Sequence, residues 1–236
     1  MRKIKYIDVD IPIIIDNNYK FKSCVDEKWK FADNIYRDYV YNVNDDNSND
    51  YKYVAKVLKI DNREADRVRN ELIISKLMSD EGIGPKVYDM SLNENEGIII
   101  MNKFDGNLHQ LMSKYKTNKN IKMLDIINVV SGLTKKMHSL NIFHGDLHLR
   151  NILYSNSGDI AISDFGNSLY TTSQELKDSE LINLDGFKKI YQLINEDSLE
   201  FYYEDTIDNI MFDVTCISSP YNFNFTWNGT SCEWYG

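Results

Sequence analysis

The chain has 236 residues and a formal net charge of −9, with 27 Lys and Arg against 36 Asp and Glu. This acidic balance argues against non-specific binding to nucleic acid, because such binding needs a basic surface to neutralise phosphates. The apolar fraction of 42% and the charged fraction of 27% are typical of a folded protein, so extensive disorder is not expected. No apolar run approaches the roughly 20 residues that span a bilayer, so we expect no membrane segment.

The cysteines and the N-terminus bear on the compartment. Cys24, Cys216 and Cys232 are odd in number and scattered, with no CxxC pair, which favours a reducing environment. The first residues are basic but lack the apolar region and the cleavage site of a signal peptide. We therefore expect a cytoplasmic protein, in the host cytoplasm if the protein is viral.

The N-terminal part of the chain is predicted to form an antiparallel sheet with one helix. The expected elements, in chain order, are an extended segment at residues 3–15, strands at 39–41 and 53–58 joined by a polar loop at 42–50, a helix from Asp61 or Asn62 to about Ser79, and strands at 87–88 and 98–101 around a turn at 93–97. Gly82 and the Gly84-Pro85 pair end the helix.

The C-terminal part begins with a predicted helix at about residues 121–139. One face of this helix is apolar at steps of three and four: Ile126, Val130, Leu133, Met137 and Leu140. A short hairpin follows, with strands at 152–154 and 160–162. Residues 190–236 contain no Lys, Arg or His, but eight acids and 11 of the 29 aromatic residues. Since disordered segments are poor in aromatics, we expect this tail to fold onto the body or to form a surface for a protein partner.

The hairpin brings polar side chains together. Its strands are antiparallel, so its two ends lie side by side, about 5 Å apart. Asn151 precedes the first strand and Asp164 follows the second, while Asp146 lies on the loop that enters the hairpin. Oxygen ligands converging in this way suit a hard cation such as Mg²⁺, with phosphates and water completing its shell.

The residues around this hairpin resemble the catalytic signature of protein kinases. His144-Gly145-Asp146-Leu147-His148-Leu149-Arg150-Asn151 reads as H-x-D-x-x-x-x-N, and Asp164-Phe165-Gly166 reads as D-F-G. The chain is similar, over roughly residues 50–190, to the protein-kinase-like superfamily, and especially to small atypical serine/threonine kinases of the RIO and KEOPS-complex types. The resemblance implies a two-lobed α+β fold, with an N-lobe of sheet and helix at residues 1–103 and a minimal, helical C-lobe at 104–236.

The resemblance also implies roles for residues upstream of the signature. Lys56, in Val54-Ala55-Lys56, looks like the strand lysine that binds ATP phosphates, and Glu71 looks like its ion-pair partner, with Glu64 as the rival. Residues of the segment that would bind adenine are Met101, Asn102 and Phe104.

Further roles fall in the C-terminal part. By resemblance, Asp146 is the base that accepts the proton of the substrate hydroxyl, and Asn151 and Asp164 hold Mg²⁺. Asp185 looks like the helix aspartate that braces the catalytic loop. His148 stands where many protein kinases carry lysine, as in aminoglycoside and choline phosphotransferases.

Several departures from the kinase pattern stand out. No glycine precedes Gly82, so the glycine-rich phosphate loop is missing, and residues 16–30 are expected in its place. Gly145 replaces the arginine that usually precedes the catalytic aspartate, so control by a phosphorylated activation loop is not expected. The segment between Asp164 and Asp185 is short.

The expected function is therefore ATP- and Mg²⁺-dependent phosphoryl transfer to a Ser or Thr hydroxyl of a protein. Two alternatives stay open. A small-molecule phosphotransferase would explain His148 and the short C-lobe, and a pseudokinase that acts as a binding scaffold would explain the missing glycine-rich loop.

Overall fold

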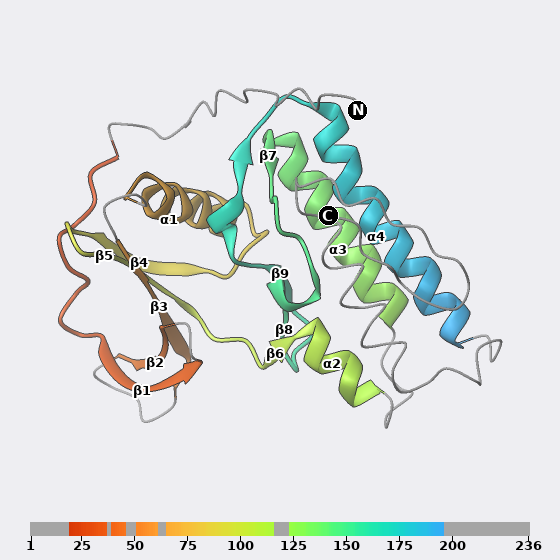
Figure 1. The fold of residues 1–236 in the computed structure, drawn as a ribbon. Coiled ribbons are helices and arrows are strands. Elements are labelled where there is room, and N and C mark those ends of the chain that lie inside the picture. The colour runs from red at the N-terminus through yellow and green to blue at the C-terminus, as the bar shows by residue number, and fades with distance from the viewer. Residues whose placement is uncertain (1–18, 37–38, 46–50, 61–64, 116–122, 196–236) are drawn as a thin grey trace, which may run out of the picture.

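The chain folds into a five-stranded antiparallel sheet with one long helix, followed by a mainly helical part (Figure 1). The computed structural model describes residues 19–36, 39–45, 51–60, 65–115 and 123–195. The predicted extended segment at 3–15 and most of the acidic tail, from residue 196 onward, lie outside these described residues.

The sheet has the strand order β1-β2-β3-β5-β4. The strands are β1 (Lys30–Tyr36), β2 (Val40–Asn44), β3 (Tyr53–Lys59), β4 (Val87–Leu92) and β5 (Glu96–Asn102). The predicted hairpin is confirmed as β2 and β3, which pair Val40 with Lys56. Since β5 pairs with both β3 and β4, the central strands are β3 and β5, and β3 carries Lys56.

The two faces of this sheet are covered differently. Helix α1 (Ala65–Asp80) packs one face, where Val68 and Leu72 meet Met90 and Ile99. The other face is covered by the side chain of Trp29 in a cluster with Val43, Ala55 and Ile100. Because successive strand residues point to opposite faces, burial of Ala55 on the second face directs Lys56 to the face of α1.

Helix α1 ends in a turn that fixes the start of the next strand. Gly82 has a positive φ of 64°. Its N–H donates to the carbonyl of Ser79, and the N–H of Ile83 donates to that of Met78. This pair of bonds is the Schellman motif, which satisfies the last carbonyls of a helix and favours glycine at the left-handed position.

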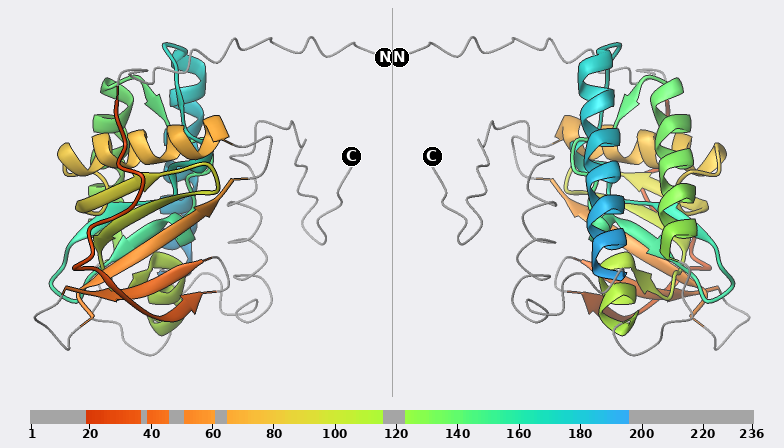
Figure 2. Two further views of the ribbon diagram at one scale, coloured as in Figure 1. Left: turned by 90° about the vertical axis from the view of Figure 1, so that its left-hand side faces the viewer. Right: turned by 90° about the vertical axis from the view of Figure 1, so that its right-hand side faces the viewer.

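The C-terminal part contains α2 (Leu108–Tyr115), α3 (Met123–Ser139) and α4 (Gln174–Asn195), together with the short strands β6 (Gly106–Asn107), β7 (Ile142–Phe143), β8 (Ile152–Tyr154), β9 (Ile160–Ile162) and β10 (Leu169–Tyr170). Helices α3 and α4 lie side by side (Figure 2). Their core also takes in Ile74 and Met78 of α1, so a continuous apolar cluster joins the two parts. This arrangement confirms the α+β fold with a small C-lobe. None of the helices in the described ranges has the length and apolar character needed to cross a membrane.

Candidate active site

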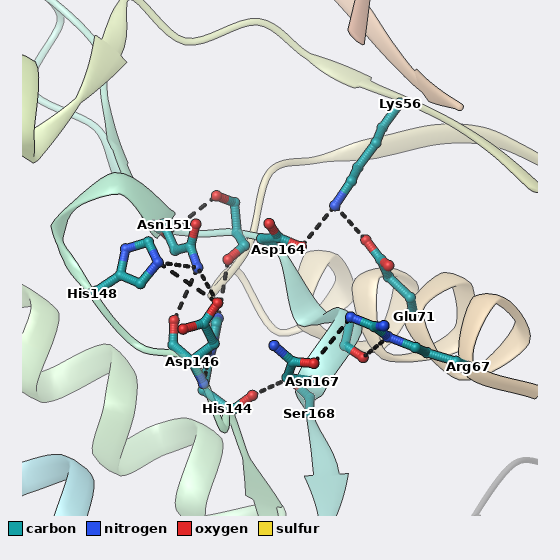
Figure 3. A network of polar contacts seen from close by, with 12 residues as sticks. Lys56, Arg67, Glu71, His144, Asp146, His148, Asn151, Asp164, Asn167 and Ser168 are labelled. Carbon is teal, nitrogen blue, oxygen red and sulfur yellow. Dashed lines mark hydrogen bonds and ion pairs between the residues drawn. The ribbon is translucent and has the colours of Figure 1, made fainter. Parts of the chain in front are cut away.

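A lysine held between two carboxylates forms the centre of the site (Figure 3). The Nζ atom of Lys56 lies 2.6 Å from Oε1 of Glu71 on α1 and 2.8 Å from Oδ1 of Asp164, which follows β9. Strand β3, the helix that follows it and the distant segment after β9 therefore meet at one ammonium group. The structure pairs Lys56 with Glu71, while the rival Glu64 lies outside the described residues.

Burial and charge act on these three groups in opposite directions. Burial alone would lower the pKa of Lys56, but the two carboxylates outweigh it and raise this pKa, so the ammonium stays charged. Burial raises the pKa of Glu71, and the lysine only partly offsets it. Burial would also raise the pKa of Asp164, but the lysine outweighs it and lowers this pKa. Asp164 is thus held ionised, with a side chain 49% exposed and accessible to a further cation.

The loop before β8 gathers the other polar residues. The Asn151 side-chain amide donates to the backbone oxygen of Asp146 at 2.9 Å. The His148 ring accepts the N–H of Arg150 at Nδ1 at 3.2 Å, and its Nε2 lies 3.3 Å from the amide nitrogen of Asn151. The same Nε2 atom lies 3.6 Å from Oδ2 of Asp146. Asp146, His148 and Asn151 therefore face one another in a single cluster (Figure 3).

The β8–β9 hairpin brings this cluster to Asp164, as the sequence predicts. Ile152 pairs with Ile162, and the N–H of Ser163 donates to the carbonyl of Asn151 at 2.8 Å. Figure 3 shows Asn151 and Asp164 next to each other. Asp164 has the left-handed backbone angles φ 67° and ψ 68°, a conformation that costs a non-glycine residue about 1–2 kcal/mol. The packing around it holds this conformation and aims its carboxylate at Lys56.

A buried carboxylate on α4 braces the loop from behind. Glu180, 1% exposed, accepts the N–H of Gly145 at 2.8 Å and the N–H of His144 at 3.3 Å. Its Oε2 also lies 2.7 Å from Nε2 of His138 on α3. The side chain thus satisfies two backbone donors of the catalytic loop and ties that loop to two helices.

The prediction that Asp185 makes this brace is wrong. Asp185 is exposed on the same helix, five residues after Glu180, which turns it about 140° around the helix axis. Helix α4 begins at Gln174, and at its start the hydroxyl oxygen of Ser173 accepts the N–H of Leu176. The signals for Glu180 were this serine cap and the spacing of Glu180 with Leu184, a helix position that is also buried.

His144 is a buried structural residue of the loop. Its Nδ1 accepts the N–H of Asp146 at 3.2 Å, and its Nε2 lies 3.0 Å from the carbonyl of Ser163. These two contacts require a neutral ring with the proton on Nε2. Burial lowers the pKa of His144 in agreement with this. The ring also packs 5.3 Å from that of Phe165, centroid to centroid, which connects the loop to the D-F-G segment.

The glycine at position 145 has a steric cause. Its φ is +79°, and a Cβ atom there would fall well inside contact distance of the carbonyl oxygen of Asn167. Any larger residue would combine backbone strain with a clash against the chain that follows Phe165. The absence of arginine at this position therefore follows from how closely the loop and the D-F-G segment approach.

The residues predicted to meet adenine lie where β5 leaves the sheet. Met101 is half-buried and pairs with Val54 across β3 and β5. The side-chain oxygen of Asn102 accepts the N–H of Lys86 at 2.6 Å, so this side chain is turned toward the start of β4. The N–H of Asn102 in turn donates to the carbonyl of Lys86 at 3.0 Å, so the backbone donor of Asn102 is also bound to the segment before β4. Phe104 is half-buried in the connection to β6.

The expected place of the missing glycine-rich loop needs correction. The turn above Lys56 joins β1 to β2, between Tyr36 and Val40, and residues 37 and 38 lie outside the described part. Of residues 16–30, those at 22–26 run along the β4 edge, where the N–H of Asp26 donates to the Asp89 carboxylate and Lys22 forms an isolated β-bridge with Ser91. They therefore support the sheet and do not cover a phosphate site.

Comparison with known families agrees with this geometry. The sequence matches the protein kinase domain over residues 39–184, which is more than half of the chain. The chain belongs to the protein kinase domain family. No curated protein sequence matches it significantly. The matched range includes Lys56, Glu71, the catalytic loop and Asp164, and the protein is therefore a phosphotransferase of the kinase type. It also includes Glu180 and stops before Asp185.

Proposed function

We propose that the protein transfers the γ-phosphoryl group of ATP, with Mg²⁺, to a Ser or Thr hydroxyl of a protein. The observation that carries this proposal is the assembled set of charges: Lys56 bonded to both Glu71 and Asp164, with Asp146 and Asn151 beside them. Phosphoryl transfer depends mainly on positioning and on neutralising charge, and this set supplies both.

The nucleotide would lie between the proposed N-lobe, residues 1–103, and C-lobe, residues 104–236. Lys56 would bind its phosphates while Glu71 holds the lysine in place. Its adenine would border Met101 and Phe104 and the backbone of Asn102. Concave sites between two lobes are where nucleotides commonly bind.

The donor chemistry fits Mg²⁺. Asn151 uses its amide nitrogen for Asp146, so its amide oxygen is the group that can bind a cation. Asp164 offers a carboxylate whose lowered pKa keeps it ionised. One amide oxygen and one carboxylate, completed by phosphate oxygens and water, is a usual Mg²⁺ shell. When bound, the ion would neutralise the charge of the phosphates.

The reaction would proceed by attack of the acceptor oxygen on the γ-phosphorus. The new P–O bond forms as the bond to the β-phosphate oxygen breaks, and ADP leaves. Asp146 accepts the hydroxyl proton. We propose that His148, whose Nε2 lies 3.6 Å from Oδ2 of Asp146, positions this carboxylate beside the transferred group.

The acceptor separates two candidates. We propose a protein acceptor, and within the family a likeness to the small RIO-type and KEOPS-complex kinases. Residues 165–173 alone connect Asp164 to α4, and this brevity matches such small kinases. His148 and the same short connection also favour a second candidate, a small-molecule phosphotransferase of the aminoglycoside or choline kinase kind.

Transfer of radiolabelled phosphate from ATP tests the proposal. The wild type should label itself or generic protein substrates, and Asp164→Ala should not, while Asp185→Asn, which changes an exposed acid, should label as the wild type does. Equal labelling by the wild type and Asp164→Ala would refute the assigned role. ADP release stimulated by an alcohol or an aminoglycoside, without protein labelling, would favour the second candidate.

A scaffold without catalysis is the remaining alternative. A scaffold that binds no nucleotide predicts no Mg²⁺-dependent stabilisation by ATP, whereas our proposal predicts a rise in melting temperature that needs both components and disappears in Lys56→Met. A scaffold that binds ATP without transferring its phosphate would show the rise in melting temperature but no labelling. The aromatic, acidic tail at 190–236 remains our candidate surface for a protein partner. Its charge argues against nucleic acid as that partner.

A further inference from the structure

The three residues after Phe165 are bonded directly to helix α1, and Figure 3 shows the part of this contact that Arg67 makes. Arg67 donates through Nε to the carbonyl of Gly166 and through Nη2 to Oδ1 of Asn167, both at 3.0 Å. The side-chain amide of Asn70 donates to the carbonyl of Ser168 at 2.9 Å. Two residues of α1 thus bind three consecutive residues of the segment.

The same segment is fixed on its other side to the catalytic loop. The hydroxyl of Ser168 donates to the carbonyl of His144 at 3.0 Å. A Cβ on Gly145 would collide with Asn167, and a Cβ on Gly166 would lie 2.9 Å from Oε2 of Glu71. Residues 166–168 therefore pack tightly between α1 and the catalytic loop, with no room for a side chain at Gly166 or Gly145.

The position of α1 decides whether Glu71 reaches Lys56. Arg67 lies one turn before Glu71, and Asn70 is its neighbour in the chain. Sliding or rotating α1 away from Lys56 would break all three bonds to residues 166–168. We propose that Arg67 and Asn70 are positioning residues that lock α1 in the catalytically competent place, so that the kinase is assembled without modification of residues 165–173. This inference rests on the proposed function.

Several hydroxyl groups of this segment make structural contacts, while Thr172 is exposed. That of Ser168 is bonded to His144, and that of Tyr170 accepts the side-chain amide of Asn141 at 3.1 Å. Thr171 accepts the N–H of Ser173 through its hydroxyl oxygen. Phosphorylation of Ser168 would remove the hydrogen atom that its hydroxyl donates to the carbonyl of His144, and would so break a contact that holds the segment.

A kinetic comparison with a matched control tests the lock. Arg67→Ala removes a cation and two bonds, and Arg69→Ala removes a cation from the same helix that instead contacts the carbonyl of Tyr19. We expect kcat/KM for ATP to fall about tenfold in Arg67→Ala, to fall less in Arg67→Lys, and to change less than about twofold in Arg69→Ala. Equal losses in both alanine variants would overturn the proposal.

A double-mutant cycle separates positioning from general destabilisation. If Arg67 acts only by placing Glu71, then Arg67→Ala should cost less than about twofold when added to Glu71→Gln. If the loss of kcat/KM in the double variant equalled the product of the losses in the two single variants, the proposed positioning role of Arg67 would be contradicted. Phosphatase treatment of the wild type, followed by mass spectrometry of residues 165–173, should leave the rate unchanged. A loss of activity that follows removal of phosphate from this segment would also contradict it.

Hydrogen exchange makes the test independent of turnover. Amides of α1 should exchange at least about threefold faster in Arg67→Ala and Asn70→Ala, and at the wild-type rate in Arg69→Ala. If the wild type transfers no phosphate but α1 responds in this way, the proposed function fails and the lock stands. If the wild type transfers phosphate but the amides of α1 exchange at the same rate in all variants, the positioning role of Arg67 and Asn70 is refuted while the proposed function stands.

Discussion

The brace between α4 and the catalytic loop gives the sharpest test of the site. Glu180→Gln keeps the size of the side chain but replaces one acceptor oxygen with a donor. The contact of 2.7 Å with His138 is lost, or the bond from a loop N–H is lost in its place. A hydrogen bond to a charged acceptor contributes about 1.5–3 kcal/mol. For a chain of this size, such a loss lowers the melting temperature by about 3–12 °C.

Asp185→Asn is the matched control, since it removes the same charge from an exposed position of the same helix. It should change the free energy of unfolding by less than about 0.5 kcal/mol. Thermal unfolding followed by circular dichroism measures both variants. In the phosphate-transfer assay, kcat should fall at least about tenfold in Glu180→Gln because the loop that aims Asp146 shifts, and should stay within about twofold in Asp185→Asn. If Asp185→Asn proved the more damaging variant, the assignment of the brace to Glu180 would be refuted.

Three other changes probe the surroundings of the site. Burial lowers the pKa of His144, so below about pH 6.5 the unfolded chain binds a proton that the folded chain does not bind. The free energy of unfolding should therefore fall as the pH drops below about 6.5, by at most about 1.4 kcal/mol per pH unit. Urea titrations at pH 7 and 5.5 measure this fall, which should be smaller in His144→Gln. Gly145→Ala should cost about 2–4 kcal/mol through its clash and positive φ, whereas Gly132→Ala, in an open part of α3, should stabilise the protein in the same denaturation assay by about 0.5–1 kcal/mol. Burial would raise the pKa of Asp89, but the hydrogen bonds that its carboxylate accepts from Asp26, Lys22 and Trp29 lower this pKa. The stability that Asp89 contributes above pH 3.8 should therefore be lost in more acidic solution. In Asp89→Asn, the free energy of unfolding should depend less on pH in acid.

The parts of the site that the sequence predicts correctly are those built by local structure. Asp146, Asn151 and Asp164 fall within one loop and one tight hairpin, and strand pairing brings the ends of such a hairpin together. The pairing of Lys56 with Glu71 was predicted from the resemblance to kinases, and it joins a strand to the next helix in the chain. In both cases the residues lie on neighbouring elements of the chain, and neighbouring elements commonly pack against each other.

The brace was missed because helix phase depends on where a helix begins. Asp185 was assigned to the brace by resemblance to the kinase pattern, without a prediction of where its helix begins. In the structure, α4 starts at Gln174 and continues through Gly186. That start sets which acid faces the catalytic loop, and it selects Glu180. The packing of residues 22–29 against β4 was missed for a different reason, since Asp26 and Asp89 are 63 residues apart and no local pattern links them.

A third kind of contact leaves even less trace in the sequence. Arg67 binds the backbone oxygen of Gly166, Asn70 binds that of Ser168, and Glu180 accepts the backbone N–H of Gly145. Each of these contacts joins one side chain to a backbone group. Because almost every peptide unit carries the same donor and acceptor, no complementary pair of residue types in the sequence predicts such a contact. What the sequence can show is the consequence: glycine occupies positions 145 and 166, where a helix or a loop approaches the backbone too closely for a Cβ. The glycines of this kinase therefore mark where its catalytic loop and α1 are held, although they do not identify the side chains that hold them.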